Sequence, residues 1–293
     1  MDYRSFSRLE ELASERDRPI WEIIIEAEMQ ESELEREEIM KKMRERLEVM
    51  REAVERGLEN DFESVGGLRG GDADRLSRSD EFLGSDLTRK TAEAALATAE
   101  VNAGMGRIVA GPTAGASGIV PAVVLSLAGE KNLSEEIQIR GLLTAGGLGS
   151  IVASEATLSG AAGGCQAECG VGSAMAAGAA VAMLEGSTEQ IFNAFALALK
   201  NLLGLVCDPV AGLVEVPCVK RNAFAATHAL TAASLALAGV ESVIPADEVV
   251  EAMAQIGDML PCSLKETAEA GLADTETGRE LEENIRDRQQ QQQ

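Results

Sequence analysis

The sequence has few aromatic residues and a single histidine. Aromatic side chains make up 3% of the 293 residues, whereas alanine and glycine are abundant. A β-sandwich core needs more aromatic and β-branched residues, so small residues in this proportion favour closely packed helices. The sequence therefore predicts an all-α fold, in which an Ala/Gly-rich multi-helix catalytic domain follows a charged N-terminal helical region.

Basic residues are also scarce, and the formal net charge is −23. Nucleic-acid binding requires a basic face, so we predict no nucleic-acid partner.

The uncharged run 108–129 is interrupted by Pro112, Pro121 and several glycines, which argues against a membrane span. The charged N-terminus shows no secretory signal. Five cysteines, an odd number, are typical of thiols or metal ligands, and we predict a cytoplasmic protein.

Composition divides the chain into four regions. Residues 1–58 form the charged helical region, 59–86 a Gly-rich loop or linker, 87–275 the helical catalytic domain and 276–293 a disordered tail. The first region carries an apolar stripe with helical spacing, typical of a helix packed on its own core or on a partner subunit. The stripe consists of Met43, Leu47, Met50, Val54 and Leu58.

Helical periodicity and end signals place the main helices. We predict helices at about 87–106, 117–129, 133–147, 149–160, 167–185, 187–204, 220–239 and 246–257. Ser187 and Gln190 have the spacing of a capping box, and Asp247 is a candidate cap for the helix that follows it.

Four cysteines are candidate metal ligands. "GGCQAECGVG" places Cys165 and Cys169 on one helical face if the stretch is helical. Cys207 and Cys218 each lie beside a proline, which indicates loops or helix ends. The intervals of 42 and 11 residues that follow Cys165 fit neither a zinc ribbon nor a ferredoxin run. Spacing alone leaves a metal site and simple packing thiols both open.

Several motifs together resemble one family. "GCQAECG", "CDPVAGLVEVPC" and "KRNAFAA" are similar to the α subunit of iron–sulfur-dependent L-serine dehydratases (L-serine ammonia-lyases). "GGLRGGDADRL", "NAGMGRIVAGPTAGASGIVPAVV" and "KETAEAGLAD" resemble further blocks of that family in the same order. The resemblance covers about residues 5–275, and the combination is far more specific than any single block.

The resemblance implies a cofactor and its ligands. In the family three cysteines hold a 4Fe–4S cluster and leave one iron free for substrate, and the matching positions are Cys165, Cys207 and Cys218. Cys169 and Cys262 match no cluster position and are interpreted as packing or incidental thiols. No pyridoxal phosphate is implied.

The implied reaction converts L-serine to pyruvate and ammonia. It would make the chain a carbon–oxygen lyase of amino-acid catabolism and gluconeogenesis, with an open iron acting as a Lewis acid. Alternatives are a related lyase acting on L-threonine, or on L-cysteine as a desulfidase. A non-catalytic metal or thiol protein and a small-residue membrane bundle are further alternatives, the last disfavoured by the charges and prolines.

"GPTAGASG", residues 111–118, is the candidate substrate loop. Backbone N–H groups at a helix N-terminus form an anion site, although an ordinary turn capping the next helix has the same sequence. The candidate residues are Thr113, Ala114, Gly115 and Ser117. Further polar candidates are Arg221, Asn222 and Lys265, each equally suited to a structural role.

No general base is evident in the sequence. Glu168 is interpreted as a carboxylate that orients the site or satisfies a buried partner, Asp208 as a helix cap and His228 as a structural histidine. In split enzymes of the family the β subunit carries a serine- and histidine-bearing motif, so we predict a β partner and a homo- or hetero-oligomer. The charged N-terminal helices are the predicted contact surface.

Overall fold

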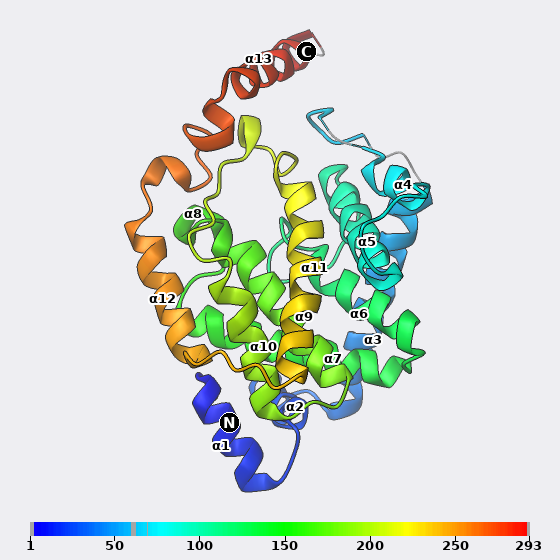
Figure 1. Cartoon of the computed structure of the whole chain (residues 1–293), viewed down its shortest axis with the longest axis vertical. Helices are drawn as coiled ribbons and strands as arrows, with labels where there is room; N and C mark the ends of the chain where they lie inside the picture. Colours follow the sequence, from blue (N-terminus) through cyan, green and yellow to red (C-terminus); the bar gives the residue numbers. More distant parts are fainter. Residues whose placement is uncertain (1–2, 60–62, 69, 292–293) are drawn as a thin grey trace.

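The computed structural model describes residues 3–291 except 60–62 and 69, and it is built from helices (Figure 1). The α-helices are α1 (Phe6–Arg16), α2 (Ile20–Ser32), α3 (Arg36–Glu59), α4 (Asp72–Ser77), α5 (Asp86–Ala103), α6 (Ile119–Lys131), α7 (Glu135–Glu155), α8 (Gly160–Gly163), α9 (Val171–Met183), α10 (Thr188–Lys200), α11 (Cys218–Leu237), α12 (Ala246–Met259) and α13 (Glu276–Gln291). The described residues contain no strand, only one isolated β-bridge. The predicted all-α fold is confirmed.

Helix α9 lies at the centre of the fold. Every residue of α9 except Ala182 is buried, and the helix packs against α6, α7, α10 and α11. Its small residues allow these helices to approach closely: a methyl group added to Gly178 would lie 2.4 Å from Leu148 Cδ1. The Ala/Gly-rich composition therefore serves close helix packing.

The N-terminal helices share this core. The Phe6 ring of α1 lies 5.2 Å from the Phe192 ring and 4.6 Å from the Phe195 ring of α10, measured between centroids. Leu47 of α3 is fully buried in the same cluster. The apolar stripe of α3 thus packs on the chain's own core, one of the two alternatives that its spacing allowed.

Two helix ends test the predicted caps. Ser187 and Gln190 form the predicted capping box at the start of α10. Asp247 instead lies inside α12, and its carboxylate accepts hydrogen bonds from the backbone N–H groups of Phe6 (2.8 Å) and Ser7 (3.0 Å). It therefore caps α1, so the predicted cap of α12 is wrong.

The two helices predicted over 133–160 are largely one helix, α7. Gly141 and Gly149 pack against methionine side chains and do not break it.

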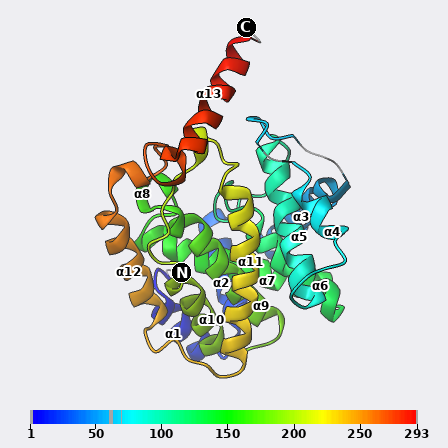
Figure 2. The ribbon, with the colours of Figure 1, turned by 45° about the horizontal axis from the view of Figure 1, so that its top comes forward.

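The C-terminal segment is a helix, not the predicted disordered tail. Thr275 Oγ1 accepts a hydrogen bond from the N–H of Gly278 (3.1 Å) at the start of α13. Ile285 is 5% exposed, and Arg288 donates to the carbonyl oxygen of Gly66 (2.6 Å). Figures 1 and 2 show α13 at one end of the molecule, projecting from the helical body. Residues 292–293 lie outside the described part of the chain.

The Gly-rich region 59–86 contains α4 and is fastened to a distant segment. The buried carboxylate of Glu215 accepts hydrogen bonds from the N–H groups of Gly66 (2.6 Å) and Leu68 (3.2 Å), and from the Ser64 hydroxyl. These contacts hold the region against the loop that precedes α11. Among the described helices, none is both long and apolar enough to cross a bilayer.

Candidate active site

The structure brings the predicted cysteines together. The Cys165 thiol is hydrogen-bonded to Cys169 and Cys207. Cys218 is near enough for the charge of Cys165 to raise its pKa. Cys165, Cys169 and Cys207 are buried, Cys218 is half-buried and Cys262 is exposed. Cysteines distant in sequence therefore form one cluster, and Cys262 lies at the surface.

A π-helical turn places Cys165. The turn covers Gln166–Gly170, directly after Cys165, and such turns are frequent at functional sites. The fully buried Gln166 side chain donates to the carbonyl oxygens of Gly163 (2.9 Å) and Met253 (3.1 Å). It also accepts from the N–H of Gly204 (2.9 Å). One side chain thus fixes α8, α12 and the segment that leads to Cys207.

Backbone bonds hold Cys207 on its loop. Its N–H donates to the carbonyl oxygen of Leu264 (2.9 Å), and its carbonyl oxygen accepts from the N–H of Glu266 (2.7 Å). Together they form the isolated bridge with Lys265. Lys265 thus lies opposite Cys207, while its two neighbours make the hydrogen bonds and its own N–H donates to the carbonyl oxygen of Cys262 (3.0 Å). This arrangement agrees with the predicted loop position of Cys207.

Arg221 and Asp208 fasten the same loop from the other side. Arg221 donates to the carbonyl oxygen of Val206 (2.9 Å) and to Asp208 Oδ1 (2.9 Å). Asp208 Oδ2 accepts from the N–H of Leu272 (2.8 Å), in a short 3₁₀ turn over Gly271–Asp274. Asp208 thus bonds the backbone of a distant turn and pairs with Arg221, instead of capping an α-helix as predicted.

Asn222 connects the candidate substrate loop to Cys218, the first residue of α11. Its Nδ2 donates to the carbonyl oxygens of Gly115 (2.7 Å) and Cys218 (2.9 Å). Its Oδ1 accepts from the N–H of Gly118 (2.9 Å). The side chain is 1% exposed. Both of its N–H groups and its oxygen bond the protein backbone, which assigns Asn222 a structural role.

Among the described residues, the buried Ser117 hydroxyl has no hydrogen-bond partner, and Ser117 is 0% exposed. Thr113 Oγ1 is also buried, and it lies close enough to the Glu168 carboxyl to lower its pKa. Buried polar atoms are normally paired, so an orphaned hydroxyl on a loop before the N-terminus of α6 is consistent with a polar ligand. Ala114 is exposed, and its methyl group offers no hydrogen bond.

Glu168 lies between this loop and the cysteines. A methyl group added to Gly115 would lie 3.7 Å from Glu168 Oε1. One added to Gly160 would lie 2.7 Å from Glu168 Oε2 and 3.0 Å from Cys207 Sγ. Burial, together with the nearby charge of Cys165, raises the pKa of Glu168 to about 7. The carboxyl is thus a polar group shared by the loop and the thiol cluster.

The cluster favours one thiolate. Hydrogen bonds from Cys169 and Cys207, with the Arg221 charge, lower the pKa of Cys165. Hydrogen bonding to Cys165 raises the pKa of both Cys169 and Cys207, and burial raises the pKa of Cys218 to about 12. A metal bound to these thiols displaces their protons, so ligation would replace this hydrogen-bonded arrangement.

The residues present fit an iron–sulfur cluster. Within the described residues, no three His, Cys, Asp or Glu side chains converge as a site for a single metal ion. An iron–sulfur cluster does not require its ligands to converge on one metal ion, because each thiolate binds a different iron. The donors here are thiols, and the missing side chain of Gly160 allows Glu168 and Cys207 to approach its backbone closely.

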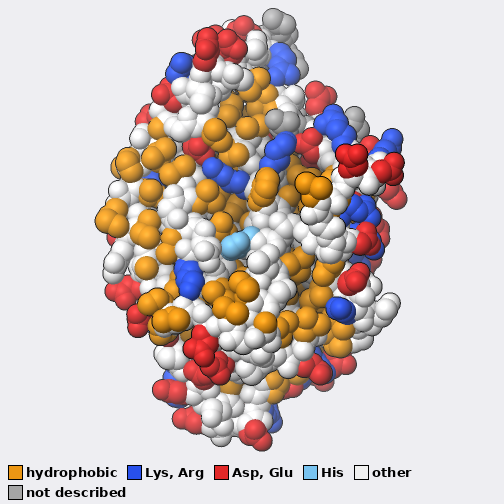
Figure 3. All heavy atoms as spheres, viewed as in Figure 1, with side chains coloured by type: hydrophobic (Ala, Val, Ile, Leu, Met, Phe, Trp, Pro, Cys, Tyr) orange, Lys and Arg blue, Asp and Glu red, His pale blue; other side chains and the backbone are white. Residues whose placement is uncertain are grey.

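Three features of the site were not predicted. The anchoring role of Gln166 and the electrostatic contact of Glu266 with Glu168 depend on residues far apart in sequence. The close approach of Glu168 and Cys207 to Gly160 is likewise visible only in three dimensions. His228 is half-buried on α11, and its Nε2 lies 3.0 Å from the carbonyl oxygen of Ala198, as expected for a structural histidine. Figure 3 shows mostly uncharged side chains in the middle of the face where α11 lies.

Comparisons with known proteins identify the family of this chain. The family model "Serine dehydratase alpha chain" matches residues 15–273. "Probable L-serine dehydratase, alpha chain" of Bacillus subtilis (strain 168) is 50% identical over 286 residues, 97% of this chain and 95% of that protein. "L-serine dehydratase, alpha chain" of Peptoniphilus asaccharolyticus is 42% identical over 274 residues, 92% and 94% of the two chains.

A longer relative matches over part of its length. "L-serine dehydratase" of Streptomyces coelicolor is 40% identical over 231 residues, which cover 77% of this chain and 51% of that protein. The family model spans most of the present chain, and the alpha-chain relatives match it nearly end to end. The chain therefore belongs to the serine dehydratase alpha chain family.

Proposed function

We propose that this chain is the alpha subunit of an iron–sulfur L-serine dehydratase, a lyase that converts L-serine to pyruvate and ammonia. The observation that carries the proposal is the cluster of Cys165, Cys207 and Cys218 beside a loop with the orphaned hydroxyl of Ser117. Pyruvate formation places the reaction in amino-acid catabolism and gluconeogenesis, and we assign the enzyme to the cytoplasm.

Cys165, Cys207 and Cys218 are the proposed ligands of a 4Fe–4S cluster. When bound, the cluster supplies a Lewis-acidic iron that weakens the bond between serine and its hydroxyl group. Cys169 is hydrogen-bonded to Cys165, and we propose that it packs beside the cluster without being a ligand. Arg221 stabilises negative charge on Cys165, which assists ligation by this thiol.

The loop 111–118 is the proposed binding site for the serine carboxylate. Its backbone N–H groups precede α6, where the helix dipole favours an anion. The hydroxyls of Thr113 and Ser117 can donate to a bound carboxylate, and that of Ser117 has no other partner among the described residues. Asn222 keeps Gly115 and Gly118 in place, so the loop is preformed.

The base that removes the serine α-proton comes, in this proposal, from a β subunit. The chain has one histidine, and the His228 ring nitrogen lies 3.0 Å from a carbonyl oxygen of α10. Glu168 remains beside the thiols and the loop, where it is suited to orient bound groups. Loss of water then gives aminoacrylate, which hydrolyses to pyruvate and ammonia.

The test is a substrate comparison under anaerobic conditions. The chain is reconstituted with iron and sulfide, combined with its β chain, and supplied separately with L-serine, L-threonine and L-cysteine. We expect the highest kcat/KM for L-serine, with equal yields of pyruvate and ammonia, and little turnover when the β chain is omitted. Sulfide release from L-cysteine at a higher kcat/KM would instead identify a desulfidase, and an iron-free, inactive complex would contradict the proposal.

A further inference from the structure

A cavity of about 460 Å³ lies between the N-terminal helices and the catalytic core. It is bounded by α2, α3, α6 and α7, and its walls are largely apolar. The main apolar residues are Ile24, Ile39, Met43, Val120, Leu143 and Met175. The volume falls in the range of small-molecule sites, and none of the proposed cluster ligands lines the cavity.

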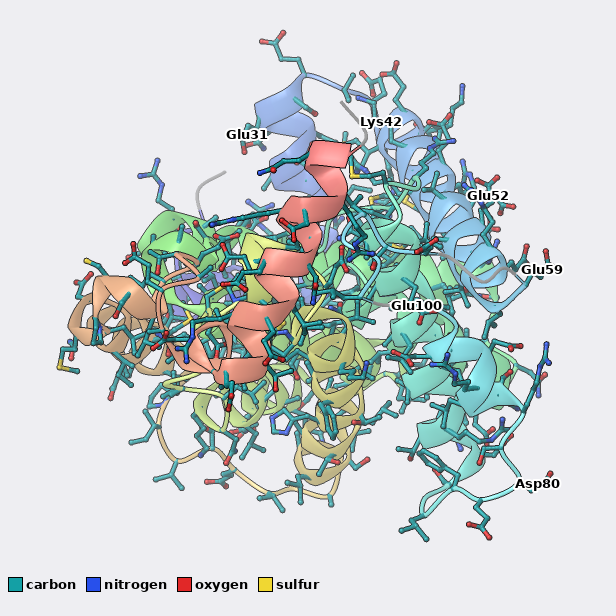
Figure 4. The ribbon with its side chains drawn as sticks, turned by 90° about the horizontal axis from the view of Figure 1, so that it is seen from above. Glu31, Lys42, Glu52, Glu59, Asp80 and Glu100 are labelled. Atoms are coloured by element: carbon teal, nitrogen blue, oxygen red, sulfur yellow. The ribbon has the colours of Figure 1, made fainter. Side chains whose placement is uncertain are left out.

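Charged side chains of both signs border the same cavity. Lys42 and Arg46 lie one turn apart on α3, and Glu28 lies on α2. Figure 4 shows Lys42 and Glu31, near the end of α2, at the same edge of the molecule. The border therefore combines two cations with a carboxylate.

These three charges have no charged partner in the part of the chain that the structure describes. Among the described residues, Glu28, Lys42 and Arg46 form no ion pair, and an Arg46 Nη1 contact with Met43 Sδ (3.3 Å) is a weak one. Arg36 at the start of α3 is by contrast paired with Glu22 of α2 (2.9 Å). The charges around the cavity thus remain available to a ligand.

We propose that this cavity binds an apolar α-amino acid. Lys42 and Arg46 would bind the carboxylate, Glu28 the ammonium group, and the apolar walls the side chain. A simple fatty carboxylate would leave Glu28 uncompensated, and a neutral hydrocarbon would use none of the three charges. The zwitterion matches both the charges and the walls.

The position of the cavity links it to the loop 111–118. Val109, Ala110 and Gly111 form part of its wall, and they lead directly into that loop. A ligand in the cavity would therefore contact the segment that enters the proposed substrate site. Binding itself does not depend on the proposed function, so it is measured on the full chain without turnover.

Isothermal titration calorimetry with three matched probes tests the proposal. L-Leucine carries both charges, 4-methylpentanoate lacks the ammonium group, and 3-methylbutylamine lacks the carboxylate. We expect L-leucine to bind at least about tenfold more tightly than either analogue, because each analogue loses one charged contact.

Three variants assign the contacts. Lys42→Glu and Arg46→Glu should each weaken L-leucine binding at least about tenfold. Glu28→Gln should weaken L-leucine binding but not that of 4-methylpentanoate. Lys41→Glu makes the same charge change at an exposed neighbour that does not line the cavity, and it should leave binding unchanged. All four positions are exposed, so matching thermal unfolding curves are expected.

Three results would overturn the proposal. One is the absence of saturable L-leucine binding to the wild-type chain. Another is equal weakening by Lys41→Glu and Lys42→Glu, which would indicate only a general charge effect. The third is equally tight binding of 4-methylpentanoate and L-leucine, which would assign the cavity to simple carboxylates.

Discussion

Asn222 Nδ2 lies 2.7 Å from the carbonyl oxygen of Gly115, so a residue of α11 fixes the backbone of the candidate substrate loop. The same amide group bonds the carbonyl oxygen of Cys218, and Oδ1 bonds the N–H of Gly118. The loop and the start of α11 are therefore held in one geometry. The relative position of a proposed ligand and the proposed substrate site depends on this one side chain.

Asn222→Asp should damage both stability and activity. The change places a carboxylate against two carbonyl oxygens in a buried site, and we expect the free energy of unfolding to fall by about 3 kcal/mol. Displacement of the loop should also raise KM for L-serine. Urea unfolding and steady-state kinetics measure the two effects. Asn284→Asp, the same change at an exposed asparagine, serves as control, and equal losses in both variants would refute the assigned role.

Ser117→Ala should weaken substrate binding without destabilising the protein. The Ser117 hydroxyl is buried and unpaired, so its removal should leave the free energy of unfolding unchanged or slightly higher. KM for L-serine should rise. Ser173 is equally buried, but its hydroxyl donates to the carbonyl oxygen of Ala225 (2.7 Å). Ser173→Ala should therefore lower stability by about 1 kcal/mol, and an unchanged KM in Ser117→Ala would contradict the substrate role.

Gly160→Ala should reduce iron incorporation. The new methyl group would lie 2.7 Å from Glu168 Oε2 and 3.0 Å from Cys207 Sγ, so both groups must shift. We expect a lower iron content after anaerobic reconstitution. Gly146→Ala is the matched control, since no atom lies within 4 Å of the added methyl group. It should keep its iron and gain about 1 kcal/mol of stability from helix propensity. Normal iron content in Gly160→Ala would count against the site.

Glu100 should make stability depend on pH. Burial raises its pKa. Among the described residues Oε2 has no hydrogen-bond partner, although Oε1 accepts from the N–H of Asp72 (2.6 Å). The folded state therefore binds the proton more tightly than the unfolded state. The stability associated with this group is present below the ordinary carboxyl pKa and is lost as pH rises through the raised value. Glu100 is labelled in Figure 4.

Glu100→Gln removes this dependence. Its stability should match that of the wild type near pH 4 and exceed it at pH 8 by about 1 kcal/mol, because no charge is then buried. Urea unfolding at both pH values measures the difference. A variant less stable than the wild type at pH 8 would show that the charged form is stabilised in the fold.

Features set by local sequence could be predicted. Small residues indicated close helix packing, the Ser187–Gln190 spacing gave a capping box, and the prolines beside Cys207 and Cys218 placed both cysteines outside helix interiors. Each of these depends on residues within a few positions of one another. The resemblance to a family then selected Cys165, Cys207 and Cys218 from the five cysteines.

Features that depend on distant contacts could not be predicted. Asp247 caps a helix that begins 241 residues earlier, and Gln166 bonds residues 38 and 87 positions away. The polar composition of the last segment gave no sign that Ile285 would be buried or that Arg288 would bond Gly66. In each case tertiary packing, not local propensity, determines the outcome.

The most direct test of the account replaces each cysteine by serine and measures iron and sulfide after anaerobic reconstitution. Cys165→Ser, Cys207→Ser and Cys218→Ser should lose most of the iron and its visible absorption. Cys169→Ser, which alters a thiol hydrogen-bonded to Cys165, and Cys262→Ser at the surface should retain both. Full iron content in any of the first three variants, or its loss in Cys169→Ser, would contradict the proposed ligand set.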